Sequence, residues 1–103
     1  QINLTDDPAR GGARPDEIEA LAERVLRSRS LRLRGVMAVA PLEEAPASAF
    51  ARLAGYSDRV RALEPAASFI SAGMTHDYAE AIAAGATHLR IGTAITGNRP
   101  VAG

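Results

Sequence analysis

Apolar segments with the composition of buried strands alternate with helical patterns along the chain, and this alternation constrains the fold more than any other feature. The segments that we predict to be strands are residues 1–4, 31–40, 66–73 and 87–92. The segments that we predict to be helices are residues 15–29, 46–64 and 76–85. This order is typical of an α/β fold, in which right-handed crossovers connect the strands of a parallel sheet.

The helical segments carry both periodicity and end signals. In the first of them the apolar residues recur at helical spacing, namely Ile18, Leu21, Ala22, Val25 and Leu26,. In the last, Asp77 stands where an N-cap is expected, Glu80 follows three residues later as its capping-box partner, and Gly85 suits the end,. These signals support the helices between the predicted strands.

Four parallel strands leave two architectures open, a small doubly wound sheet or part of a (β/α)₈ barrel. A complete barrel needs about 250 residues, whereas this chain has 103. The chain also opens directly with a strand, "QINL", as though cut from a longer protein. We therefore expect one partial domain over residues 1–103, the C-terminal half of a (β/α)₈ TIM-type barrel with four parallel strands.

Composition excludes several classes of function. The net charge is zero, which suggests no nucleic-acid partner and no anionic membrane surface, and no apolar run is long enough to span a bilayer,. Cysteine is absent, so there are no disulfides and no thiolate metal sites, as is usual in the cytoplasm,. All 12 basic residues are arginine, so no lysine is available to form a Schiff base.

The chemistry of parallel α/β folds gathers at the carboxyl ends of the strands. After the third and fourth predicted strands, glycine and a hydroxyl recur in the turns Gly73–Thr75 and Gly92–Thr93. Glycine lets a ligand approach the backbone, and free amides attract an anion. These turns predict a phosphate site between them. The alternative is that both glycines only permit tight turns.

Arg90 is a permanently charged residue inside the last predicted strand. Strand residues alternate between the two faces, so Arg90 and Gly92 share a side opposite Ile91,. If Gly92 faces a ligand, Arg90 does too. The alternative is that Arg90 forms an ion pair with a buried carboxylate, because buried charges are usually paired.

Three stretches resemble a known family: "LRLRGVMAVAP", "FISAGMTHDYAEAIAAGATHLRIGTAITGNRP" and the opening "QINL" followed by "GG". They are similar to the C-terminal half of the pyridoxal phosphate homeostasis proteins, and the similarity covers nearly the whole chain. The resemblance implies a barrel like the N-terminal domain of alanine racemase, with pyridoxal 5′-phosphate (PLP) as its cofactor.

The resemblance also implies roles for single residues. The hydroxyl of Thr75, with Gly92 and Thr93, would hold the phosphate, Arg90 would face the pyridine nitrogen, and Asn3 would lie near the cofactor. The complete set of cofactor-binding residues that we predict is Met74, Thr75, Arg90, Gly92, Thr93, Asn3 and Ser71. A guanidinium donates hydrogen bonds and cannot be deprotonated, so Arg90 would keep the ring nitrogen unprotonated. This suits storage or delivery of PLP better than catalysis.

The missing lysine separates three hypotheses about function. In the first, the chain is part of a PLP homeostasis protein whose lysine-bearing half lies elsewhere, and its partners are PLP and apo PLP-dependent enzymes in the cytoplasm. In the second, it is a cofactor-free half barrel that self-associates through exposed sheet edges. In the third, it is a racemase-like PLP enzyme.

Overall fold

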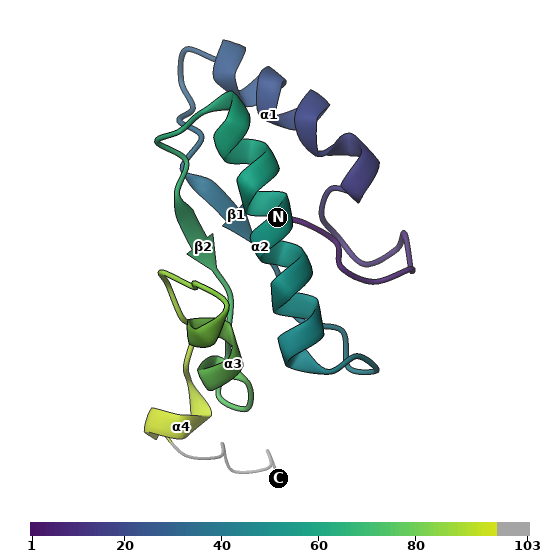
Figure 1. The fold of residues 1–103 in the computed structure, drawn as a ribbon, viewed down its shortest axis with the longest axis vertical. Coiled ribbons are helices and arrows are strands. Elements are labelled where there is room, and N and C mark those ends of the chain that lie inside the picture. The colour runs from purple at the N-terminus through teal and green to yellow at the C-terminus, as the bar shows by residue number, and fades with distance from the viewer. Residues whose placement is uncertain (97–103) are drawn as a thin grey trace, which may run out of the picture.

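The computed structural model describes residues 1–96, and helices and strands alternate along it (Figure 1). The helices are α1 (Ile18–Arg27), which the short 3₁₀ helix η1 (Pro15–Glu17) precedes, α2 (Pro46–Leu63), α3 (Tyr78–Ala83) and α4 (Thr93–Thr96). The strands are β1 (Gly35–Met37) and β2 (Phe69–Ser71). The first two predicted helices are confirmed almost to the residue. The third is shorter than predicted.

β1 and β2 pair in parallel and form the centre of the sheet. Their register places Gly35 opposite Phe69 and Met37 opposite Ser71. A parallel pair needs a crossover, and α2 supplies it, as Figure 1 shows,. The α/β class with a parallel sheet, which the alternation predicted, is therefore confirmed.

Within residues 1–96, the other two predicted strands contact the sheet through a few backbone hydrogen bonds and form no regular strand. On the β1 side, the Ile2 amide donates to the Met37 carbonyl at 2.8 Å, but the Asn3 amide turns away to Ala13. On the β2 side, His88 bridges to Ser71 in parallel orientation. The expected sheet of four strands is thus two strands with one hydrogen-bonded segment on each side within residues 1–96.

The Thr87 side chain explains why residues 87–92 do not form a regular strand. The Ile70 amide donates to the Thr87 hydroxyl at 2.8 Å, where a regular ladder would use a backbone carbonyl. The Thr87 and His88 amides then share one acceptor, the Ile70 carbonyl. Regular parallel pairing is limited to the bridge at His88, whose carbonyl accepts from the Ala72 amide at 3.1 Å, and the Arg90 amide then donates to the Gly73 carbonyl at 2.9 Å. Sequence periodicity carries no signal for such a competition between side chain and backbone.

The hydrophobic core lies between the helices and one face of the sheet. α2 supplies Phe50 and Leu53, which are almost completely buried, β1 supplies Val36, and Ala38 follows directly after β1. α1 and α3 both pack against α2, so the helices gather on this side (Figure 1). Burial of a side chain such as Leu53 stabilises the fold by about 1.5–3 kcal/mol. None of the helices within residues 1–96 combines the length and apolar character that a membrane crossing requires.

No helix within residues 1–96 covers the opposite face of the sheet. Side chains alternate along the strands, so Met37 and Ser71 point away from the core, as does Phe69, which is 41% exposed,. His88 is exposed beside them. We call these residues, Met37, Phe69, Ser71 and His88, the open face.

Ser57 on α2 is a defect in this core, because its hydroxyl is buried without a hydrogen-bond partner among the described residues. Replacement by alanine removes an unsatisfied polar group and favours the helix. We expect Ser57→Ala to raise the free energy of unfolding by about 1 kcal/mol, measured by urea denaturation. Ser68→Ala, at an exposed loop position, should change it little. A loss of stability in Ser57→Ala would show that the hydroxyl has a partner after all.

Candidate functional site

The structure brings together the two turns that the sequence marked as a phosphate site. Thr75 follows β2, and Thr93 is the first residue of α4. The Thr93 hydroxyl donates to the Thr75 hydroxyl, with 3.0 Å between the oxygens. Residues 18 positions apart thus present two hydroxyl groups to one place. Hydroxyl groups suit a phosphate because each can donate a hydrogen bond to its oxygens.

Gly73 is glycine for reasons of backbone and packing. Its φ of +100° lies in the region that favours glycine, and the residue is buried,. A Cβ atom at this position would lie 2.7 Å from the Ala81 Cβ and 2.9 Å from a Leu89 methyl carbon. Gly73 therefore lets α3 and residues 87–90 pack closely against the turn. This fits the alternative interpretation, in which the glycine only permits a tight turn.

Asp77 organises the same turn in a way that the sequence did not predict. Its carboxylate accepts a hydrogen bond from the Met74 amide at 2.7 Å and makes no capping bond to α3. The expected capping box with Glu80 is therefore wrong. The Met74 amide therefore has its hydrogen-bond partner within the turn itself.

Gly92 has open space beside it. A Cβ atom there would meet no heavy atom within 4 Å, and the residue is exposed. Its carbonyl accepts hydrogen bonds from the Ile95 and Thr96 amides and so begins α4. No contact within the described chain demands glycine here, so a ligand has room to approach this backbone.

Arg90 reaches across β2 to the end of β1. Its guanidinium donates to the Ala38 carbonyl at 2.9 Å. The ion pairs within residues 1–96 join Arg52 to Glu44 and Arg59 to Glu19, so the expected alternative, a buried carboxylate partner, is not found in this part of the chain. The buried Nε atom of Arg90 has no partner there either. A buried donor left unsatisfied costs about 1–3 kcal/mol, which is a reason to look for a ligand acceptor.

Asn3 contacts the loop that follows residues 1–4, and Ser71 lies on the open face. The Asn3 side-chain amide donates to the carbonyls of Asp7 at 2.9 Å and Arg10 at 2.7 Å, and its oxygen accepts from the Thr5 amide and hydroxyl. All of these bonds hold the loop after residues 1–4. Ser71 lies on the open face, between Met37 and His88. The predicted cofactor contacts of Asn3 and Ser71 stay predictions.

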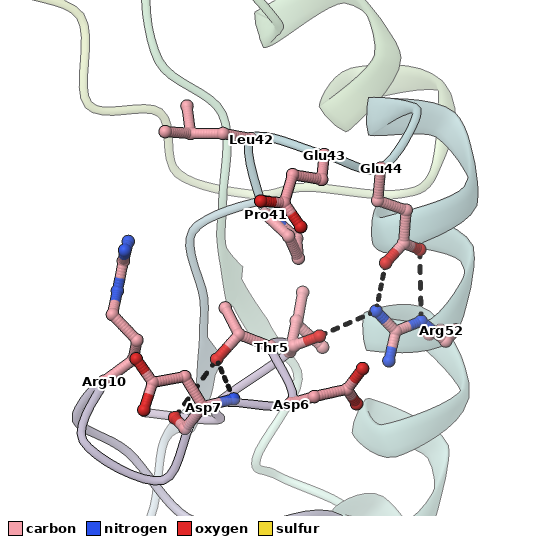
Figure 2. A pocket seen from close by; sticks show the side chains of 10 residues that line it. Thr5, Asp6, Asp7, Arg10, Pro41, Leu42, Glu43, Glu44 and Arg52 are labelled. Atoms are coloured by element: carbon pink, nitrogen blue, oxygen red, sulfur yellow. Dashed lines mark hydrogen bonds and ion pairs between the residues drawn. The ribbon is translucent and has the colours of Figure 1, made fainter.

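Another pocket lies between the loops that follow residues 1–4 and β1. It has a volume of about 850 Å³, and Figure 2 shows the side chains that line it. Arg52 on α2 makes two hydrogen bonds with Glu44 and one with the Leu4 carbonyl at 2.9 Å. Sequence analysis assigned this pocket no role, because an ion pair between a loop and a helix leaves no periodic signal.

The ion pair between Arg52 and Glu44 also stabilises the charged forms of both side chains. The hydrogen bond from Arg52 lowers the pKa of the Glu44 carboxyl below its ordinary value, and the pKa of Arg52 is raised in turn,. Asp6, Asp7 and Glu43 add negative charge to the lining. Among the described residues, no group of three or more histidine, aspartate or glutamate side chains is arranged to hold a metal ion.

Comparison with known proteins gives one family and a consistent set of relatives. The family model described as "Alanine racemase, N-terminal domain" matches residues 1–100. The pyridoxal phosphate homeostasis protein of Mycobacterium tuberculosis (strain H37Rv) is 39% identical over 102 residues, which are 96% of this chain and 40% of that protein. The protein of the same name from Pseudomonas aeruginosa is 40% identical over 102 residues, 96% of this chain and 43% of that protein.

Solved structures agree with the sequence comparison. PipY of Synechococcus elongatus without PLP has a TM-score of 0.80 and 28% identity, covering 90% of this chain and 46% of PipY. PipY with PLP bound has a TM-score of 0.76 and 27% identity, covering 88% of this chain and 44% of PipY. The chain thus spans less than half the length of the relatives that it matches.

We expect Gly73→Ala to lower the free energy of unfolding by about 2 kcal/mol, because the new methyl group overpacks the contact with Ala81 in an unfavourable backbone region,. Gly55→Ala is the matched control. Gly55 lies inside α2 with no atom near its missing Cβ, so alanine there should stabilise by about 0.5–1 kcal/mol,. Urea denaturation of both variants measures this, and equal effects would contradict the packing role of Gly73.

The lowered pKa values of Glu19 and Glu44 predict a pH dependence of stability. A carboxyl whose pKa is lower in the folded state contributes stability above its unfolded pKa, and the contribution is lost as pH falls through the folded pKa. The urea midpoint should therefore fall as pH drops below the ordinary value of 4.5. The double variant Glu19→Gln, Glu44→Gln should flatten this fall.

Glu43→Gln is the control for this titration, because Glu43 forms no ion pair among the described residues. This variant should leave the dependence of the urea midpoint on pH unchanged. An equal flattening in Glu43→Gln and in the double variant would show that the two ion pairs do not cause the dependence.

Proposed function

Because the chain belongs to the family of the alanine racemase N-terminal domain, we propose that it binds PLP as part of a pyridoxal phosphate homeostasis protein. Relatives of that name are about 39–40% identical to it, and the related PipY has a structure with PLP bound. The proposed role is storage of PLP and its delivery to apo enzymes in the cytoplasm.

The proposed architecture is the C-terminal half of a (β/α)₈ barrel, with residues 1–103 as one partial domain. Two observations support it. The Ile2 amide bonds to Met37 of β1 and His88 bridges to Ser71 of β2, so these two segments flank the strand pair in the order that consecutive barrel strands would have,. The match also covers about 40% of the length of its relatives. The activity of the complete protein is therefore proposed here for a part of it.

The contact between Thr75 and Thr93 is the observation that carries this function. A phosphate beside the two hydroxyl groups would replace Thr75 as the acceptor of the Thr93 proton, and it would then accept hydrogen bonds from side chains of two different turns,. The open space beside Gly92 leaves room for it, and Met74 is 45% exposed next to Thr75. We assign Thr75, Gly92 and Thr93 to the phosphate, with Met74 beside it.

Arg90 supplies the second half of the proposed site. Its buried Nε lacks an acceptor within residues 1–96, so the guanidinium suits an acceptor such as a pyridine nitrogen,. When bound, PLP supplies an aldehyde that reacts with amines and a ring that can withdraw electrons. A guanidinium beside the ring nitrogen cannot give up its proton and therefore keeps that nitrogen unprotonated. Asn3 and Ser71 complete the proposed surroundings of the cofactor.

The absence of lysine decides which part of PLP binding this chain can perform. Its side chains offer hydrogen bonds to the phosphate and the ring but no amine for covalent attachment. This fits a carrier better than an enzyme, and we propose no catalytic cycle for the chain. A racemase-like enzyme and a cofactor-free half barrel are the alternatives, and PLP titration separates the last of these from the carrier.

We expect Thr93→Val to weaken PLP binding about tenfold or more, because a hydrogen bond to a charged group contributes about 1.5–3 kcal/mol. Thr93→Ser keeps the hydroxyl and should bind within about threefold of the parent chain. Equilibrium dialysis with PLP measures both, with inorganic phosphate as competitor. Equal affinities of the valine and serine variants would rule out the proposed phosphate contact.

Arg90→Ala should weaken PLP binding and shift the absorption band of bound PLP, because the ring nitrogen loses its hydrogen-bond donor. Arg61→Ala removes an exposed arginine at the end of α2 and should change neither. Circular dichroism confirms that each variant is folded. An unchanged spectrum and affinity in folded Arg90→Ala would show that Arg90 does not face the cofactor.

A further inference from the structure

The turn between β2 and α3 is anchored at both of its ends. At its start, the Gly73 carbonyl accepts a hydrogen bond from the Arg90 amide at 2.9 Å. At its end, the Asp77 carbonyl accepts one from the Ala81 amide of α3 at 3.1 Å. Thr75, which we assign to the phosphate, lies halfway between these two anchors. Its hydroxyl has one fixed position only if the residues between the anchors are held as well.

Asp77 and Met74 hold the middle of this turn by two hydrogen bonds. The Met74 amide donates to the Asp77 carboxylate at 2.7 Å, and the Asp77 amide donates to the Met74 carbonyl at 3.3 Å. The carboxylate thus accepts from the amide three residues before it, as the acidic residue of a capping box does. Thr75 lies inside the closed segment, residues 74–77.

The Asp77 side chain supports the turn rather than the hydrophobic core. It is partly buried and does not belong to the cluster of apolar side chains that forms this core. The ion pairs within residues 1–96 join other residues, so the carboxylate acts here as a hydrogen-bond acceptor. A neutral acceptor of the same shape would serve equally well, and removing it should leave the core intact.

We infer that Asp77 is a positioning residue of the proposed phosphate site. Its carboxylate holds the turn that places the Thr75 hydroxyl 3.0 Å from the Thr93 hydroxyl, and it does not itself bind the ligand. The inference rests on the proposed function. A group that is ordered before its ligand arrives binds more tightly, because the binding step no longer has to order it.

The same carboxylate could have the opposite effect, which is competition. A negative charge beside a phosphate repels it, and this carboxylate also occupies an amide that a phosphate could bind. The structure favours positioning, because the carboxylate bonds within its own turn and closes the segment that contains Thr75. Asparagine separates the two effects, since it keeps an oxygen acceptor and carries no charge.

Equilibrium dialysis of the 103-residue chain with PLP provides the first test. Asp77→Ala should weaken PLP binding about fivefold or more, because Thr75 is then ordered only on binding. Asp77→Asn should bind within about twofold of the parent chain, because it restores the acceptor. Tighter binding by both variants would show competition, and equal weakening by both would show that the charge matters instead. Either result would overturn the inference.

A double-mutant cycle tests whether Asp77 acts through Thr75. Thr75→Val removes the hydroxyl and keeps the shape of the side chain, so Asp77→Ala in this background should weaken PLP binding less than about twofold further. Additive effects would contradict a positioning role. Asp58→Ala is the matched control, because Asp58 is exposed on α2 and forms no ion pair within residues 1–96. It should leave the affinity unchanged.

Hydrogen exchange of the Met74 amide, followed by NMR without PLP, gives a measurement that is independent of the ligand. Asp77→Ala should speed up this exchange about tenfold or more, because the amide loses its acceptor, and Asp77→Asn should restore the slow rate,. Unchanged exchange in Asp77→Ala would overturn the role of Asp77 alone. Absence of PLP binding by the parent chain would overturn the proposed function, so the two failures can be told apart.

Discussion

The packing of α2 against one face of the β1–β2 pair is the contact on which the rest of the structure depends. Phe50 and Leu53 of α2 are almost fully buried in one core with Val36 of β1 and Ala38, which follows that strand. α1 and α3 contact α2, so they reach the same side of the sheet through it. Because this single contact gathers the helices on one side, the sheet has a covered face and an open face.

This asymmetry explains where the chemistry of the chain is located. The turns after β2 and before α4 meet at Thr75 and Thr93, while Arg90 crosses the sheet to the end of β1. These groups come from segments far apart in the sequence, and the core aligns their ends. The phosphate and ring contacts that we propose both depend on this alignment.

Sequence patterns predicted the elements better than their contacts. Helical periodicity located α1 and α2 closely because it reports a buried face, which both helices have. The flanking strands were overestimated because apolar composition does not show that the Thr87 hydroxyl takes the Ile70 amide. The role of Asp77 was also misjudged, since the residue suits a helix cap and a turn equally well, and only the position of the Met74 amide decides between them.

The sequence by itself determined the α/β class, the parallel pairing and the residue types of the candidate site. It did so because alternation, glycine turns and the absence of lysine are local properties. The tertiary structure decided the contact of Thr75 with Thr93, the Arg52–Glu44 ion pair and the unsatisfied Nε of Arg90. These depend on distances between segments far apart in the sequence, which are set only when α2 packs on the sheet.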